Sequence, residues 1–265
     1  MITVSSLIYY PIKACRGFEV DSSQVERMGF QNDRRMMVVT LDGKQVTQRE
    51  YSKLAWALPT LHDDTVTLSA PNFDAVQIPI QKTGTPLTVT VWHGKHVQAV
   101  DQGEEAAQWF SGWLDAPMRL VHIAPGIQRR LNAEYALHED DHTGFADGYP
   151  ILVISEESLQ DLNTRLENPV PMNRFRPNLV VKGCEQYAED TWNKIKIGDV
   201  ELGIVKPCAR CEVTTIDKQT LEQSKEPLKT LAKYRKHKLG AIFGQNVIPY
   251  NEGRLELGMN VEVLS

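Results

Sequence analysis

Alternating apolar and polar positions dominate the first half of the chain and predict several short strands. The alternation runs through ITVSSLIYYPI (2–12), RRMMVVTLDGKQVTQRE (34–50), TVTLSAP (65–71) and LTVTVWHGKHVQAV (87–100). Asp42-Gly43 lies inside the second run, where an Asp-Gly pair indicates a hairpin turn. The period then becomes helical from about 103 to 114, which places four residues on one apolar face: Ala106, Trp109, Phe110 and Trp113.

The second half begins with a polar stretch at 124–149, which predicts a loop or linker. Its HEDDH sequence (138–142) is interpreted as a solvated loop, and a metal site there is the less favoured alternative. ILVI (151–154) predicts a buried strand, after which Ser155 caps a helix with acidic residues in its first turn. The remaining pattern predicts a short helix at 225–237 and strands at 175–181, 192–205, 211–217 and 259–264.

Many short strands and few helices indicate a mostly β fold with helical decoration, of the α+β class. The regular alternation of strand and helix that a doubly wound parallel sheet requires is missing from the sequence. No internal repeat, G-x-G-x-x-G motif or P-loop occurs either. The usual nucleotide-binding folds are therefore poor candidates.

Composition and charge narrow the class of protein. The chain has 265 residues and a net charge of -5, which argues against non-specific binding to nucleic acid. No run of about 18 apolar residues predicts a membrane span, and the N-terminus lacks the features of a signal peptide. The four cysteines are therefore expected to be thiols in a cytoplasmic protein, not a disulfide framework.

KPCARC (206–211) carries the most specific chemical signal, a C-x-x-C pair formed by Cys208 and Cys211. A structural zinc site needs four ligands, and no second pair supplies them. A thioredoxin-like couple expects a helix after the first cysteine, whereas the β-branched EVTTID predicts a strand. Two packed thiols at a strand end remain an equal alternative to metal binding. Arg210 favours metal binding, because a nearby cation stabilises the thiolate that soft metals select.

Other polar residues lie beside predicted strands in unusual positions. YPIKACRG places Lys13, Cys15 and Arg16 after a strand, and NDRRMMVV places Arg34 and Arg35 before one. FRPNLVV places Arg176 and Asn178 around a proline at a third strand. Each residue alone is best explained as a surface charge. Gathered at one site, these cations would suit a ligand that bears a phosphate.

Several separated segments, in this order, resemble the MOSC-domain proteins: YPIKACRG, DRRMMVV, FADGYPILVISEESLQDLN, FRPNLVV, PCARCEVTTID and EPLKTL followed by FGQN. Within that family they are most similar to the branch that contains the mitochondrial amidoxime reducing component and its bacterial hydroxylaminopurine-resistance relatives. The resemblance covers nearly the whole chain. It implies an N-terminal β-barrel domain, placed at 1–123, and a MOSC domain built on a second β barrel, placed at 124–265.

The resemblance also implies a molybdenum cofactor, a pyranopterin dithiolene with one phosphate, and assigns residues to it. Cys211 takes the role of molybdenum ligand and catalytic residue, with Cys208 as its neighbour. The remaining implied cofactor-binding residues are Lys13, Arg34, Gly148, Tyr149, Arg176, Asn178, Ala209, Arg210 and Asn246. Ala14 and Ala209 replace serines found in some relatives, and Asn246 stands where a tyrosine occurs in others. At the level of the domain, pyridoxal phosphate binding is a further expectation.

The function implied is the reduction of a small N-hydroxylated compound, with N–OH becoming N–H plus water. Some bacterial relatives carry a ferredoxin-type domain, and no cysteine cluster of that kind occurs in this sequence. Electrons are therefore expected from a separate donor protein. Two alternatives remain: a protein that carries the molybdenum cofactor or sulfur without turnover, and a thiol oxidoreductase that uses Cys208 and Cys211.

Overall fold

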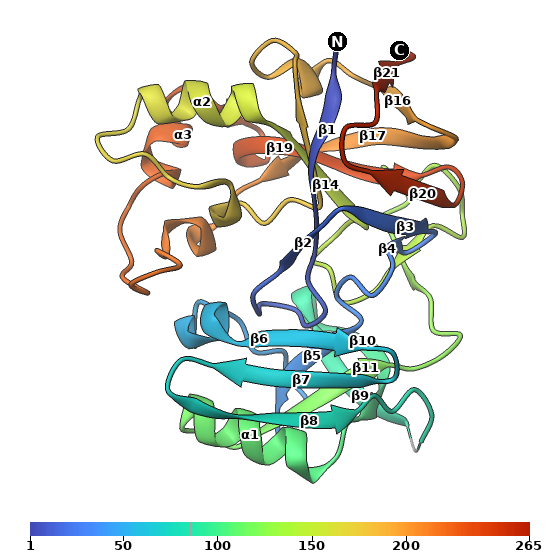
Figure 1. Cartoon of the computed structure of the whole chain (residues 1–265), viewed down its shortest axis with the longest axis vertical. Helices are drawn as coiled ribbons and strands as arrows, with labels where there is room; N and C mark the ends of the chain where they lie inside the picture. The colour runs from blue at the N-terminus through green and yellow to red at the C-terminus, as the bar shows by residue number, and fades with distance from the viewer. Residues whose placement is uncertain (85) are drawn as a thin grey trace.

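The alternating runs form strands that divide between two lobes (Figure 1). This computed structural model describes residues 1–84 and 86–265. Over those residues strands predominate and the α-helices are short, which confirms the predicted mostly β fold with helical decoration. No helix in the described part of the chain is long and apolar enough to span a membrane.

The larger lobe is built on a nine-stranded sheet. Strands β14 and β15 pair in parallel, and the neighbours along the rest of the sheet pair antiparallel. The strand order is β2 (Phe18–Val20), β1 (Thr3–Tyr9), β15 (Leu179–Lys182), β14 (Ile151–Ser155), β19 (Gly240–Pro249), β17 (Val200–Ala209), β16 (Lys194–Ile197) and β21 (Val261–Val263), with β18 (Lys236–His237) beside β19. Two smaller sheets complete this part of the chain: β20 (Gly253–Glu256) with β3 (Ser22–Glu26) and β4 (Gly29–Phe30), and β12 (Arg129–Arg130) with β13 (His142–Thr143).

The smaller lobe contains two sheets and one helix packed on them (Figure 1). Helix α1 (Glu104–Leu114) buries the predicted face, because Ala106, Trp109, Phe110 and Trp113 all lie in the apolar core of this lobe. The sheets are β5 (Met36–Thr40), β11 (Met118–Ile123), β10 (Lys95–Asp101) and β9 (Pro86–Val91), and β6 (Leu58–His62), β7 (Thr65–Ala70) and β8 (Phe73–Pro79).

The start of the chain packs with its end. Val4 and Leu7 of β1 share an apolar core with Ile151 and Val247, and Val25 of β3 lies in the same core. Strands β1 and β3 therefore belong to the larger lobe, although the domain boundary at residue 123 places them with the smaller one. Ile12 and Cys15, which lie between these strands in the sequence, pack in the apolar core of the smaller lobe. That boundary stays a prediction about sequence domains, whereas the packing concerns the folded lobes.

The helices of the larger lobe follow the sequence signals. Ser155 caps α2 (Glu156–Thr164) by accepting a hydrogen bond from the backbone N–H of Ser158 at 3.1 Å. Helix α3 (Leu228–Tyr234) begins directly after Pro227, inside the predicted helical stretch. The described chain also contains short 3₁₀ turns: η1 (Ser52–Trp56), η2 (Trp92–Gly94), η3 (Met172–Arg174), η4 (Ala188–Asp190) and η5 (Glu212–Thr215).

The strand predicted at 211–217 is wrong, because the 3₁₀ turn η5 occupies residues 212–215 in its middle. The Thr214 hydroxyl donates to the carbonyl of Cys211 at 2.9 Å, and the Thr215 hydroxyl donates to the carbonyl of Glu212 at 2.7 Å. These hydrogen bonds to carbonyls three residues earlier stabilise a turn against the β propensity of threonine. The strand predicted at 175–181 likewise begins only at Leu179, because Arg176 has a φ of +57°.

Candidate functional site

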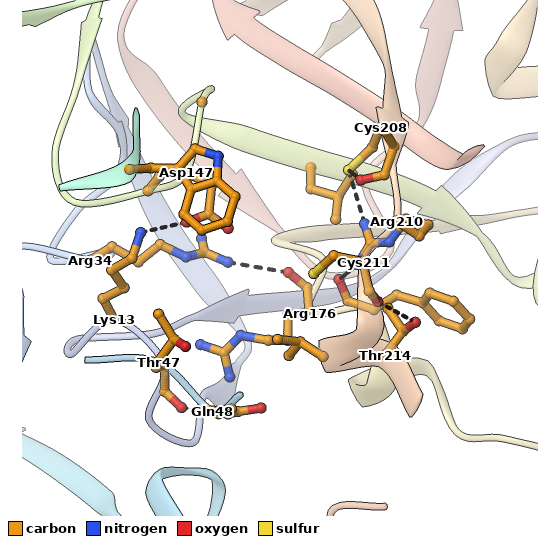
Figure 2. Close-up of a pocket in the computed structure, with 18 of the residues that line it drawn as sticks. Lys13, Arg34, Thr47, Gln48, Asp147, Arg176, Cys208, Arg210, Cys211 and Thr214 are labelled. Carbon is orange, nitrogen blue, oxygen red and sulfur yellow. Dashed lines mark hydrogen bonds and ion pairs between the residues drawn. The ribbon is translucent and has the colours of Figure 1, made fainter. Parts of the chain in front are cut away.

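A cavity of about 280 Å³ lies where the two lobes meet, and it brings the predicted site residues together (Figure 2). Thr47, Gln48, Arg49 and Trp92 line it from the smaller lobe. All ten residues predicted to bind the cofactor also line it: Lys13, Arg34, Gly148, Tyr149, Arg176, Asn178, Ala209, Arg210, Cys211 and Asn246. The convergence that the sequence left open is therefore present in the fold, while the roles of these residues stay predictions.

Lys13 lines the cavity and is nearly buried, with 7% of its surface exposed. Its Nζ donates to the carbonyl of Phe145 at 2.7 Å and to the carboxylate of Asp147 at 2.5 Å. Burial lowers the pKa of Lys13, and Asp147 opposes that effect. Desolvation tends to raise the pKa of Asp147, but Lys13 and nearby arginines outweigh it and hold that pKa below its usual range. The Asp147 side chain is 79% exposed, so a competing anion can reach this pair.

Arg34 is held in place by hydrogen bonds to the side chains of Asp33 and Asn178. Its Nη1 donates to Asp33 at 2.5 Å and to the Asn178 side-chain oxygen at 3.1 Å. The Asn178 amide in turn donates to Ile8 O and Asp33 at 3.0 Å each, and its oxygen accepts from Leu152 N at 3.3 Å. Because its amide already has protein partners, we infer that Asn178 positions Arg34.

Arg176 and Arg210 hold buried donor atoms without a protein partner. Arg176 donates from Nη1 to the Cys15 carbonyl at 2.7 Å and lies 4.1 Å from the centre of the Tyr10 ring. Its Nη2, and the Nε of Arg210, are buried and make no hydrogen bond with a described residue. Burial also lowers the pKa of Arg176. Buried donors of this kind are costly, so they indicate a place for an acceptor that the protein itself does not provide.

The backbone at the cavity adopts conformations that non-glycine residues rarely take. Ala14, Arg34 and Arg176 have φ values of +67°, +49° and +57°. Such conformations cost about 1–3 kcal/mol each and cluster at functional sites. Gly148 lines the cavity, and an added Cβ there would meet no protein atom within 4 Å, so the space beside this residue is open.

Two irregularities in β17 direct the cysteine motif into the cavity. The register of β17 against β19 shifts between Ile204 and Lys206 and again between Pro207 and Ala209. Asn246 donates from Nδ2 to the carbonyls of Lys206 and Pro207, at 3.2 and 3.4 Å, and so stabilises the bulged segment. Bulges bend a strand and re-aim its side chains, which explains how the motif leaves the sheet.

The two cysteines of the motif have different environments. Cys208 is half-buried against the apolar cluster that contains Phe175 and Phe243. Arg210 Nη1 donates a hydrogen bond to its sulfur at 2.9 Å. Cys211 is exposed at the start of η5 and lines the cavity. Figure 2 shows Lys13, Arg34 and Asp147 on one side of the cavity and Cys208, Arg210 and Cys211 on the other. Both thiols line the cavity, and Cys211 is the more exposed of the two.

Lys218 connects the segment after Cys211 to the smaller lobe. Its Nζ donates to Gln48 Oε1 at 2.6 Å and to Val213 O at 3.3 Å, and Gln48 Nε2 donates to the carbonyl of Ala14. The indole N–H of Trp56 donates to the Lys218 carbonyl at 2.9 Å. Burial, and to a smaller extent repulsion from Arg176 and Arg174, lowers the pKa of Lys218 to about 7.

This lowered pKa predicts a pH dependence of stability in the cofactor-free protein. Between about pH 7 and pH 10 the unfolded chain binds more protons at Lys218 than the folded chain, so stability rises with pH. Relative to Lys218→Met, the wild-type free energy of unfolding should rise by up to about 1.4 kcal/mol per pH unit across this range. Urea unfolding of both proteins measures the difference, and a constant offset at every pH would contradict the prediction.

Several residues of the site were missed or misplaced by sequence reasoning. Asp147 lies inside FADGYP and Asp33 directly precedes Arg34, so the motifs contained both carboxylates without revealing their pairing. Cys15 and Arg35, noted as unusual in the sequence, do not line the cavity: Cys15 is fully buried and Arg35 pairs with Glu26 at 2.7 Å.

The HEDDH loop has a structural explanation. Asp141 is 3% exposed, and its carboxylate accepts hydrogen bonds from the backbone N–H groups of Leu137 and His138, at 2.7 and 2.9 Å. Arg27 approaches the same carboxylate at 3.3 Å. Within residues 1–84 and 86–265, no group of three or more His, Cys, Asp or Glu side chains is arranged to hold a metal ion. Asp141 therefore stabilises the turn.

Comparison with known proteins extends these observations. The profile of the MOSC N-terminal beta barrel domain matches residues 1–117, and that of the MOSC domain matches residues 140–262. The mitochondrial amidoxime-reducing component 1 of Mus musculus is 40% identical over an alignment of 280 positions, which covers 99% of this chain and 82% of that protein. The human component 1 is 39% identical, with 99% and 83% covered. The solved YUAD protein from Bacillus subtilis aligns over 99% of this chain and 95% of its own, with a TM-score of 0.44 and 10% identity.

Proposed function

This chain belongs to the MOSC-domain family, and we propose that it reduces N-hydroxylated compounds at a molybdenum cofactor bound between its lobes. The observation that carries the proposal concerns Arg176 and Arg210, which line the cavity together with Cys211. Each holds a buried donor, Nη2 and Nε respectively, that makes no hydrogen bond with a described residue. Relatives that align with 99% of this chain are named amidoxime-reducing components, which supports the reaction class.

The residues present fit a cofactor with a thiolate-bound metal and a phosphate. Cys211 offers an exposed thiol, the ligand type that soft metals select. Arg176 and Arg210 offer donor atoms without a partner among the described residues, and Lys13 is paired with a carboxylate that is largely exposed. Gly148 lines the cavity without a side chain, and the space beside it is open. We therefore assign metal binding to Cys211 and phosphate binding to Lys13, Arg34, Arg176 and Arg210.

The proposed reaction converts N–OH, two electrons and two protons into N–H and one water. The cofactor supplies the two-electron redox chemistry, and the protein holds it and orients the substrate. Cys211 is exposed, so water can reach this wall of the cavity and supply protons. The lowered pKa of Asp147 keeps its carboxylate ionised at neutral pH, where it accepts hydrogen bonds and does not donate a proton.

The source of the electrons is testable with the purified chain. We expect the cofactor-loaded protein not to oxidise NADH or NADPH, because the sequence has no dinucleotide-binding motif and its four cysteines are too scattered for an iron–sulfur cluster. Reduced viologen should replace the missing donor protein and start turnover of an amidoxime. NADH-driven turnover by the pure chain would contradict this expectation. Failure with viologen at full molybdenum loading would favour the carrier function instead.

A further inference from the structure

The charges around the cavity are not balanced by the protein. Six cationic side chains line it, and three of them pair with carboxylates: Lys13 with Asp147, Arg34 with Asp33 and Arg174 with Asp217. The other three make no ion pair with a carboxylate in the described part of the chain: Arg49, Arg176 and Arg210. The cavity therefore has more positive charge than its own acidic residues neutralise.

Two of these three arginines already have a ligand under the proposed function. Arg176 and Arg210 belong to the larger lobe with Cys211, each donates to a backbone carbonyl, and each keeps one buried donor for the cofactor. A phosphate carries about 1.5 to 2 negative charges at pH 7, which these two cations can match. Arg49 remains.

Arg49 differs from them in place and in contacts. It comes from the smaller lobe, and its guanidinium lies over the Trp92 ring with its carbon 4.4 Å from the ring centre. Both residues line the cavity. No hydrogen bond from the guanidinium to a described residue accompanies this contact. Stacking holds the planar fork of an arginine in place while leaving its N–H edges able to bind an oxyanion.

We propose that Arg49, supported by Trp92, is a substrate-binding residue that selects N-hydroxylated compounds carrying a carboxylate or phosphate group. The inference rests on the proposed function and specifies its substrate class. The arginine binds two oxygens of the anionic group through two parallel hydrogen bonds, while the N–OH end of the same molecule faces the Cys211 side of the cavity. An aromatic or amidine frame between the two ends suits the flat Arg49–Trp92 surface.

A matched pair of substrates tests this selectivity. Benzamidoxime and its 4-carboxy derivative share the reacting group and differ in the anion, and a 4-phosphono derivative shows which oxyanion is preferred. With reduced viologen, we expect Arg49→Gln to lower the ratio of kcat/KM for the carboxy compound over benzamidoxime by about tenfold. Arg16→Gln is the control, because Arg16 is an exposed arginine outside the cavity, and the ratio should not change there.

A second measurement separates this proposal from the proposed reaction. Calorimetric binding of the carboxy compound to cofactor-loaded protein without reductant needs no turnover, and Arg49→Gln should weaken that binding by about tenfold. Molybdenum content should be the same in both proteins. An unchanged ratio and unchanged binding would overturn the role of Arg49. Loss of molybdenum from Arg49→Gln would also overturn it, because Arg49 would then be holding the cofactor.

Discussion

Replacing Cys211 with serine is expected to remove nearly all molybdenum from protein purified out of cells that make the cofactor. Turnover should fall by more than about 100-fold, because the thiolate is the one protein ligand proposed for the metal. Cys211 is exposed at the start of η5, so serine fits there without disturbing the core. Metal analysis per chain, together with amidoxime reduction by reduced viologen, measures both effects.

Cys208→Ser is the matched control for this prediction. Cys208 packs against an apolar cluster and contacts Arg210, so its loss should change stability more than molybdenum content. Most of the metal should remain bound in this variant. Equal molybdenum in the two variants would contradict the assignment to Cys211, and loss from both would indicate a site that uses two cysteines.

Arg176→Met is expected to weaken cofactor binding by about 10- to 150-fold, which corresponds to one charge-assisted hydrogen bond of about 1.5–3 kcal/mol. The melting temperature of the cofactor-free protein should stay within about 2 °C of the wild type. Two effects offset each other there: the bond to the Cys15 carbonyl is lost, and the cost of the buried, unpartnered Nη2 is relieved. Methionine retains apolar packing against the Tyr10 ring.

Arg174→Met is the comparison for Arg176→Met. Arg174 also lines the cavity, but its guanidinium donates hydrogen bonds to protein atoms. It bonds to Thr214 O at 2.8 Å, to Asp217 at 3.2 Å and to Glu226 O at 3.4 Å, and it is 4% exposed. Its replacement should destabilise the cofactor-free protein by about 2–3 kcal/mol. Thermal melts of both variants, and cofactor retention on a desalting column, give the comparison. An early melt for Arg176→Met would make that arginine a structural residue.

Local sequence patterns predicted the elements whose conformation depends mainly on residues within the element. The helix at 104–114 follows from its apolar face, and α2 follows from the Ser155 cap. The strand predicted at 211–217 failed because propensity counted the β-branched residues and could not weigh the threonine hydroxyl bonds that close η5. This failure matters for function, since η5 is what places Cys211 at the cavity.

Some residues of the candidate site could be predicted from the sequence, and others only from the folded structure. Motif resemblance identified residues such as Lys13 and Arg176, and the fold brought them together. The wall formed by Arg49 and Trp92 could not be predicted, because these residues lie on separate segments and become neighbours only through the packing of the smaller lobe. The same holds for Lys218, whose contact with Gln48 spans 170 residues of sequence.

The most direct measurement of the central claim relates turnover to metal content. Samples of the purified protein with molybdenum contents from none to about one atom per chain are given benzamidoxime and reduced viologen, and the amidine product is quantified by chromatography. We predict a rate of amidine formation proportional to molybdenum content, with no activity in the metal-free sample. A rate that does not depend on molybdenum, or no amidine at full loading, would contradict the claim that this chain is a molybdenum-dependent reductase of N-hydroxylated compounds.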